Sequence, residues 1–186
     1  AAPGYMAEIR RICDTHDVLF ITDEIITGYG RTGRHWGLEH DGVVPDIVAF
    51  GKGASSGYAS LGGIVIHDRI TEAFQREKAF FSHVFTYVNN PLTARVGLEV
   101  LEIMEEERTV QHAHEIGTYA LERMKLLQQH ACVGEVRGHG LLMGIELVQD
   151  ADTGAPYATE AKVSQKACLM CLERGLCVSG VTAGDF

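Results

Sequence analysis

A lysine, Lys52, stands where a short apolar strand would end, and this position suits a nucleophilic amine. The apolar run Ile47–Phe50 predicts a buried strand, and Gly51 and Gly53 on either side of the lysine allow a tight turn. Ligands of open α/β sheets bind at the carboxyl ends of such strands. Beside a buried strand the lysine would have few hydrated neighbours, and desolvation favours the neutral amine that forms a Schiff base. A lysine between two glycines is, by itself, more often an exposed loop residue.

A carboxylate, Asp23, follows a second apolar run, residues 18–22. In a parallel sheet, the residues that follow the two strands would face the same crevice. A carboxylate there can keep a heteroaromatic ring nitrogen protonated through a charge-assisted hydrogen bond, and a lysine there can hold an aldehyde as an imine. Pyridoxal 5'-phosphate requires both groups, so the pair predicts a site for this cofactor.

The hydrophobic pattern around these two residues predicts helices and strands in the order of an α/β fold. Helices are expected over 3–16, 70–74, 92–107 and 110–129, and strands over 18–22, 47–50 and 61–67. Residues 25–41 are expected to form a long loop punctuated by glycines, and loops of that length are often functional. Residues 80–91 are expected to be irregular.

The pattern changes in the second half of the chain. Strands are expected over 133–137 and 141–148, a helix over 159–174 with Gly175 as its stop, and a further strand from Cys177. This less regular alternation is typical of a smaller α+β domain, and we place the boundary near residue 105.

Four motifs resemble those of one known family. The segments TDEIITGYGRTG, PDIVAFGKGASSGY with LGG after it, FTYVNNPLTA and RGHGLLMGIELV resemble, in this order, the class III aminotransferases of pyridoxal-phosphate fold type I. The resemblance covers essentially the whole chain. It implies that residues 1–105 are the C-terminal part of a large, mainly parallel-sheet domain that binds the cofactor, including the start of the interdomain helix. Residues 106–186 would then be an incomplete small α+β C-terminal domain.

The resemblance also implies roles for single residues. Lys52 would be the Schiff-base lysine and Asp23 the partner of the pyridine nitrogen. Ile25 would pack on one face of the cofactor ring. Thr86 would donate a hydrogen bond to the cofactor phosphate across the interface of a homodimer, so that the two subunits share their active sites.

The implied activity is the transfer of an amino group from an amine or an ω-amino acid to a keto acid such as pyruvate, and Ile26 resembles the ω-amino acid:pyruvate type. Aminomutases, racemases and decarboxylases of the same fold share the lysine and the aspartate, so the motifs leave these activities open, together with a non-catalytic remnant of the fold. The chain begins without Met, and the family is well over twice as long as its 186 residues. We therefore expect a segment of a larger enzyme that is inactive on its own.

Composition narrows the range of partners. The net charge of −9 argues against nucleic acid and against an anionic membrane surface, and no apolar run approaches the length of a transmembrane helix. Five cysteines, an odd number, do not suit a disulfide framework, so we expect reduced thiols in a cytoplasmic protein. The expected partners are a small-molecule amino donor, a keto acid and a second copy of the chain.

Several other polar residues are expected to be structural. Glu24 would point to the face of the strand opposite to its neighbour, so a structural contact is favoured over a second catalytic acid. Ion pairing or a surface role is favoured for Arg31 over carboxylate binding, whereas Tyr58 stays open between the active site and packing. Cys168 and Cys171 fall in an expected helix without further ligands, so core packing is favoured over a metal site.

Overall fold

The computed structural model describes residues 2–83 and 86–180. Its contacts divide the chain into two units. One comprises Ala1–Thr118 with His139–Leu142, and the other comprises Tyr119–Gly138 with Met143–Phe186. The boundary near residue 105 concerns the domains of the whole protein, and it stays a prediction.

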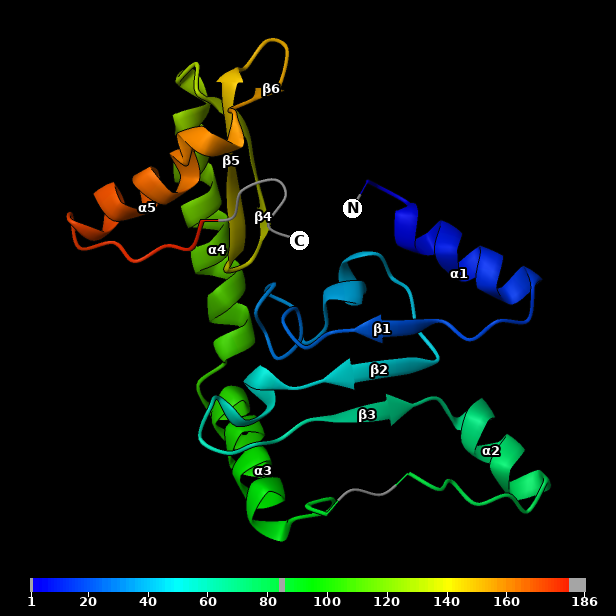
Figure 1. The fold of residues 1–186 in the computed structure, drawn as a ribbon. Coiled ribbons are helices and arrows are strands. Elements are labelled where there is room, and N and C mark those ends of the chain that lie inside the picture. The colour runs from blue at the N-terminus through cyan, green and yellow to red at the C-terminus, as the bar shows by residue number, and fades with distance from the viewer. Residues whose placement is uncertain (1, 84–85, 181–186) are drawn as a thin grey trace. The chain divides into compact units, whose positions relative to one another are not determined.

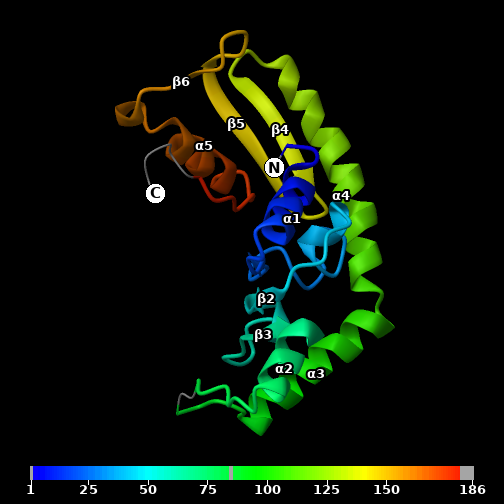
Figure 2. The same ribbon diagram turned by 90° about the vertical axis from the view of Figure 1, so that its right-hand side faces the viewer.

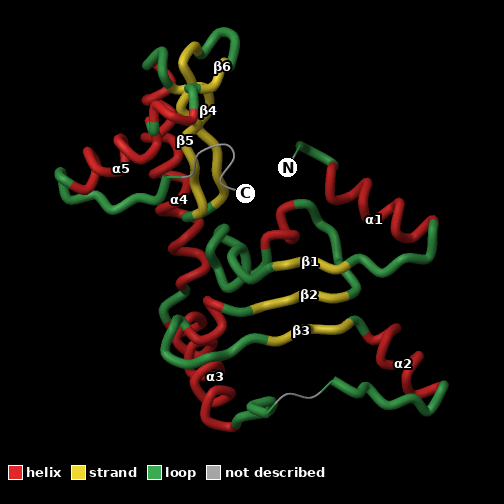
Figure 3. The backbone as a smooth tube through the Cα atoms, in the orientation of Figure 1, coloured by secondary structure: helices red, strands yellow, loops and turns green. Residues whose placement is uncertain are grey.

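The first unit is built from a three-stranded sheet and its connecting helices (Figures 1 and 3). In chain order its elements are α1 (Tyr5–Thr15), β1 (Ile21–Asp23), β2 (Ile47–Phe50), β3 (Gly63–Ile66), α2 (Asp68–Arg76), α3 (Pro91–Glu106) and the first part of α4 (Thr109–Lys125). Short 3₁₀ helices lie at Gly37–His40 and Lys52–Ser55. The α-helices and strands have the order that the sequence predicts, but β1 lies at 21–23 instead of 18–22 and β3 is shorter. The two 3₁₀ helices lie in segments where loops are expected.

The strand order in this sheet is β1-β2-β3. β1 runs parallel to β2, with Ile21 opposite Ile47 and Asp23 opposite Ala49. β3 runs antiparallel to β2. Because β1 and β2 are parallel, the residues that follow them lie at the same edge of the sheet.

The strands are less buried than the sequence predicts. Phe20, just before β1, is buried, but Ile21 is 59% exposed and Val65 of β3 is 53% exposed. A strand becomes buried only where other layers cover its faces. In the described part of the chain, the extensive contacts of these strands are with one another. The apolar runs therefore predict the strands correctly, and the expectation of full burial is wrong.

A buried carboxylate, Asp46, ties two helices to this sheet. It accepts hydrogen bonds from the Phe20 N–H at 2.7 Å and from Arg10 of α1 at 2.8 Å, and it forms an ion pair with Arg69 of α2 at 2.5 Å. Burial alone would raise the pKa of Asp46, but the Phe20 N–H and the two guanidinium groups outweigh burial and hold the pKa below its usual value. One ionised side chain thus joins α1, α2 and the start of the sheet.

The second unit contains the end of α4 and a second three-stranded sheet. Its further elements are β4 (Val133–His139), β5 (Leu142–Asp150), β6 (Ala155–Pro156) and α5 (Val163–Leu172), where β4 and β5 each have an end in the first unit. Figure 2 shows β4 and β5 as long neighbouring strands, and β6 pairs with β5 in antiparallel fashion. The expected pair of strands is confirmed.

The end of α5 follows the expected pattern, but the strand after it does not. Gly175 has a left-handed φ of +83°, and its N–H donates to the Leu172 carbonyl at 2.9 Å. The strand expected from Cys177 is wrong within the described residues, because 177–180 pair with no strand. A Cβ added to Gly180 would lie only 2.7 Å from the Cys168 sulfur, so this segment packs along α5 instead.

The five cysteines form no disulfide and are free. Cys168 and Cys171 are half-buried on α5. Within residues 2–83 and 86–180, no group of His, Cys, Asp and Glu side chains could hold a metal ion. No helix of the described chain is both long and apolar enough to cross a membrane.

Candidate active site

β1 ends at Asp23 and its parallel neighbour β2 ends two residues before Lys52, at the same edge of the sheet (Figure 1). Asp23 is the last residue of β1 and lies opposite Ala49 of β2. The pairing extends one step further, because the Glu24 N–H donates to the Ala49 carbonyl at 2.9 Å. β2 ends at Phe50, and Lys52 begins the 3₁₀ turn that follows. The structure therefore places these two predicted residues at one end of the parallel pair.

Lys52 has an unusual backbone conformation. Its φ of +41° lies in the left-handed region, which residues with a side chain rarely adopt and which is enriched at functional sites. The side chain is exposed, and its amine has no hydrogen bond or ion pair to any described residue. The expectation that Lys52 has few hydrated neighbours is therefore wrong for this chain.

Asp23 is exposed, and its Oδ1 accepts a hydrogen bond from the Ile25 N–H at 2.9 Å. This contact is an Asx turn that bends the chain directly after β1. Its Oδ2 has no partner among the described residues. Ile25 is half-buried, and a Cβ added to Gly51 would lie 3.6 Å from the Ile25 Cγ2. Ile25 thus lies beside the residue before Lys52, and its N–H is bonded to Asp23.

Glu24 is buried, with 3% of its surface exposed. Its Oε2 accepts hydrogen bonds from the Thr27 hydroxyl and from the Gly37 N–H at 2.9 Å, and its Oε1 accepts one from the Leu38 N–H at 2.9 Å. The carboxylate joins the two ends of the loop 25–36. The expected structural contact of Glu24 is confirmed.

Tyr29, which our sequence analysis did not single out, stands between this loop and the turn of Lys52. A Cβ added to Gly53 would lie 2.7 Å from the Tyr29 Cβ, and the Tyr29 ring meets the Trp36 ring edge-on at 5.5 Å. Burial raises the pKa of Tyr29. The signal in the sequence is an aromatic residue between two glycines, where Tyr29 adopts a left-handed φ of +54°.

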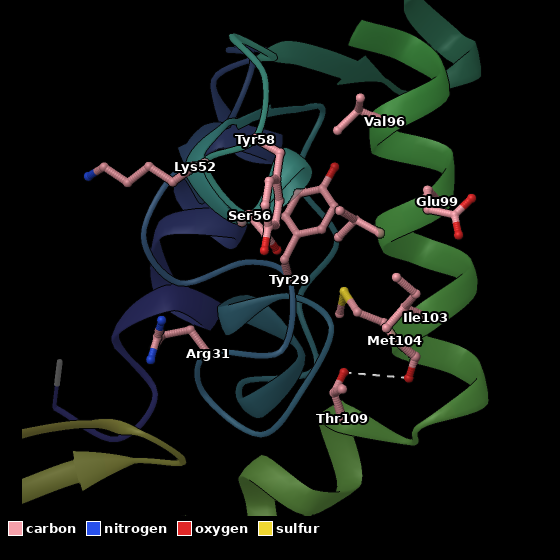
Figure 4. Close-up of a pocket in the computed structure, with 13 residues that line it drawn as sticks. Tyr29, Arg31, Lys52, Ser56, Tyr58, Val96, Glu99, Ile103, Met104 and Thr109 are labelled. Atoms are coloured by element: carbon pink, nitrogen blue, oxygen red, sulfur yellow. Dashed lines mark hydrogen bonds between the residues drawn. The ribbon is translucent and has the colours of Figure 1, made fainter. Parts of the chain in front are cut away.

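Tyr29 and the backbone of the Lys52 turn line a cleft of about 1130 Å³ against α3 (Figure 4). The wall formed by α3 is mostly apolar and includes Val96, Val100, Ile103 and Met104. Lys52 is among the residues that line this cleft, and Figure 4 shows its side chain extending away from α3.

Tyr58 and Arg31, for which the sequence leaves more than one role open, also line this cleft. Tyr58 lines it and is 86% exposed, so the packing role considered for Tyr58 is wrong. Arg31 also lines it, is exposed and forms no ion pair with any described residue. Of the two roles favoured for Arg31, the surface role fits the structure and the ion pair does not.

Thr86 is not brought to the other predicted residues by any contact within the described chain. It lies in the turn 86–89 between α2 and α3, and it is exposed. Its hydroxyl has no hydrogen bond to a described residue. Figure 1 shows the segment between α2 and α3 on the β3 side of the sheet, whereas Asp23 ends β1 on the opposite side.

Comparison with known proteins identifies the family. The sequence profile of the family "Aminotransferase class-III" matches residues 1–184. The uncharacterized aminotransferase YhxA of Bacillus subtilis is 42% identical over 94% of this chain and 39% of its own length. The putrescine–pyruvate aminotransferase of Pseudomonas aeruginosa is 36% identical over 95% of this chain and 39% of its own length.

Solved structures agree with the sequence relatives. A transaminase from the marine bacterium Virgibacillus has a TM-score of 0.93 and 36% identity, over 98% of this chain and 42% of that protein. The ω-transaminase of Pseudomonas jessenii in complex with PMP has a TM-score of 0.85 and 34% identity, over 95% of this chain and 40% of that protein. This chain spans about two fifths of the length of the proteins it matches. It belongs to the class III aminotransferases, and its α/β fold is that of the fold type I transaminases.

Proposed function

We propose that the full-length protein is a pyridoxal-phosphate-dependent aminotransferase, which transfers an amino group from an amine or an ω-amino acid to a keto acid such as pyruvate. The proposal is supported by the position of an amine, Lys52, and a carboxylate, Asp23, at the same end of two parallel strands. Family membership supports the reaction class. The names of the putrescine–pyruvate relative and of the ω-transaminase support the substrate classes.

The groups at this edge of the sheet suit the proposed cofactor. The Lys52 amine and the Asp23 Oδ2 both lack a partner within the described residues, and both are exposed. When bound, pyridoxal 5'-phosphate supplies an aldehyde that takes up amino groups and a ring that accepts electrons from the substrate carbon. The Lys52 Nζ would hold the aldehyde carbon. The Asp23 carboxylate would hold a proton on the ring nitrogen through a charge-assisted hydrogen bond.

Lys52 would also move the proton that the reaction requires. Once released by the amino donor, the Lys52 amine would act as a general base that removes the proton from the substrate Cα, and it would deliver this proton to the carbon that carried the aldehyde. Asp23 would contribute by keeping the ring nitrogen cationic, which stabilises the negative charge that develops when this proton leaves. Ile25, packed against Gly51, would lie against one face of the ring.

A second subunit would supply Thr86 to this site. Its hydroxyl is exposed and unpaired among the described residues, so it is free to donate to the cofactor phosphate. The segment between α2 and α3, which carries Thr86, lies on the β3 side of the sheet, and this placement supports a role in the neighbouring active site (Figure 1). We therefore propose a homodimer with shared active sites, located in the cytoplasm, where the five free thiols would stay reduced.

The decisive experiment incubates the full-length protein, loaded with pyridoxal 5'-phosphate, with putrescine and pyruvate. Formation of alanine is expected, and it should disappear in Lys52→Ala because the variant has no amine to hold the cofactor or to move the proton. Lys78→Ala is a matched control, since Lys78 is another exposed lysine with a left-handed φ of +51°. Normal alanine formation by Lys52→Ala would refute the assignment of Lys52 as the residue that holds the cofactor. Carbon dioxide release from an amino acid, or its isomerisation without pyruvate, would indicate a decarboxylase, a racemase or an aminomutase instead.

A further inference from the structure

We propose that Glu24 is a positioning residue for the cofactor site, which fixes Asp23 and Ile25 at the end of β1 by closing the loop that follows them. This inference rests on the proposed function, because it concerns how the chain holds the groups that would face pyridoxal 5'-phosphate.

Both carboxylate oxygens of the buried Glu24 side chain accept hydrogen bonds from the protein. Both carboxylate oxygens accept backbone N–H groups, from Gly37 and Leu38, at 2.9 Å each, and Oε2 also accepts the Thr27 hydroxyl. Gly37 and Leu38 are the first residues of the 3₁₀ helix Gly37–His40, whose N–H groups have no partner within that helix. The carboxylate therefore satisfies donors that burial would otherwise leave unpaired.

The main chain of Glu24 is held just as firmly. Its N–H donates to Ala49 of β2 at 2.9 Å, and its carbonyl accepts from the Gly28 N–H at 2.9 Å. Gly28 has no room for a side chain, because an added Cβ would lie 2.8 Å from that carbonyl and 2.9 Å from the Trp36 ring. The residue after Asp23 is therefore fixed through its backbone and its side chain together.

The orientation of the Asp23 side chain depends on the fixed position of Glu24. Its Oδ1 bonds to the Ile25 N–H across Glu24, so the Asx turn keeps its geometry only while residues 24 and 25 keep theirs. The unpaired Oδ2 is the atom proposed to meet the ring nitrogen, and its direction is set by the same turn. The loop that Glu24 closes also carries Tyr29 against Gly53, next to Lys52. Loss of the Glu24 contacts would loosen both sides of the proposed site.

A direct catalytic role for Glu24 does not fit these observations. The carboxylate is 3% exposed, and all of its donors come from the protein itself. On the strand, Asp23 faces solvent and Glu24 faces the loop, as alternation of side chains requires. Glu24 would therefore act on the reaction only through the groups that it holds.

The test compares four variants of the full-length protein. Glu24→Gln keeps the size of the side chain. Its NH₂ group would face either the Gly37 or the Leu38 N–H, so that two donors meet and one hydrogen bond is lost. Thr27→Val removes only the hydroxyl donor to Glu24, and Thr27→Ser restores it. Asp41→Asn is the matched control, because it removes an exposed carboxylate at the end of the same 3₁₀ helix, with no hydrogen bond to a described residue. The readouts are the dissociation constant for pyridoxal 5'-phosphate, kcat and KM, and the melting temperature of the cofactor-free protein.

We expect Glu24→Gln to weaken cofactor binding by about 10-fold or more, which corresponds to about 1.4 kcal/mol, and to lower kcat more than it changes KM. Thr27→Val should show a smaller loss of the same kind, and Thr27→Ser and Asp41→Asn should bind the cofactor as the unmodified protein does. If Glu24→Gln lowers only the melting temperature while its folded fraction keeps normal cofactor affinity and kcat, the role is merely structural and the inference is wrong. If the unmodified protein itself binds no pyridoxal 5'-phosphate, the proposed function fails first.

Discussion

Substitution of Asp46 by asparagine should remove a large part of the stability of the sheet and its two helices. The new amide side chain would keep the size of the old one and an oxygen for the Phe20 N–H, but not the negative charge that faces Arg10 and Arg69. The Arg10 side chain is 16% exposed and the Arg69 side chain 44% exposed, so the contact with Arg10 is the more buried of the two. The loss of the Asp46 charge would therefore destabilise the protein mainly by leaving Arg10 without this partner.

The size of the effect follows from these positions. Removal of one partner from a buried ion pair costs about 3–5 kcal/mol, whereas an exposed pair contributes about 0–1 kcal/mol. Arg10 is not fully buried, and it keeps a second ion pair with Asp14 at 2.7 Å, which compensates part of the loss. We therefore expect Asp46→Asn to lower the free energy of unfolding by about 2 kcal/mol at neutral pH, below the range for a fully buried pair.

The free energy of unfolding that Asp46→Asn loses should be smaller at acidic pH than at neutral pH. The pKa of Asp46 is lowered in the folded protein, so its stabilising effect is complete above the pKa of an unfolded aspartate, about 3.9. The effect is lost as the pH falls through the lower pKa of the folded state. The unmodified protein should thus lose stability below about pH 4, and the gap between it and Asp46→Asn should close there.

Urea unfolding of the full-length protein from acidic to neutral pH measures this gap, and hydrogen exchange of the Phe20 amide reports the same contact locally. Asp14→Asn is the control, because Asp14 pairs with the same Arg10 but is 59% exposed, and it should change stability by about 0.5 kcal/mol or less. Equal stability of Asp46→Asn and the unmodified protein at neutral pH would refute the argument. So would a gap that stays constant into the acid range, because the charge of Asp46 would then not be its cause.

Two further predictions concern close packing and the proposed dimer. Gly117→Ala should destabilise the full-length protein by about 1–3 kcal/mol or more, because the added Cβ would lie 2.3 Å from the backbone of Gly140. Gly144→Ala is the control, because no atom lies within 4 Å of the added Cβ, and it should have little effect on the melting temperature. Inactive Lys52→Ala and Thr86→Ala proteins, unfolded together and refolded, should regain about a quarter of the activity if the two residues of one site come from different subunits; no recovery would contradict a shared site.

The sequence predicts those parts of the fold that depend on local pattern. The apolar run Ile47–Phe50 and the polar residues after it give β2 and the turn of Lys52 at the right places. Burial could not be predicted in the same way, because it depends on layers that distant segments supply. For that reason Lys52 is expected among apolar neighbours but is exposed.

The candidate site shows the same division between local and distant determinants. Asp23, Glu24 and Ile25 are adjacent in sequence, so strand alternation alone separates a solvent-facing acid from a buried one. Tyr29 was missed, because its contacts with Gly53 and Trp36 arise only when the loop folds back on the turn of Lys52. Thr86 was found only through the family motif, since neither its local pattern nor a contact in the described chain connects it with Asp23. The proposed homodimer would bring Thr86 to the site from a second copy of the chain, and so the mixing of two inactive variants tests the dimer and the role of Thr86 at once.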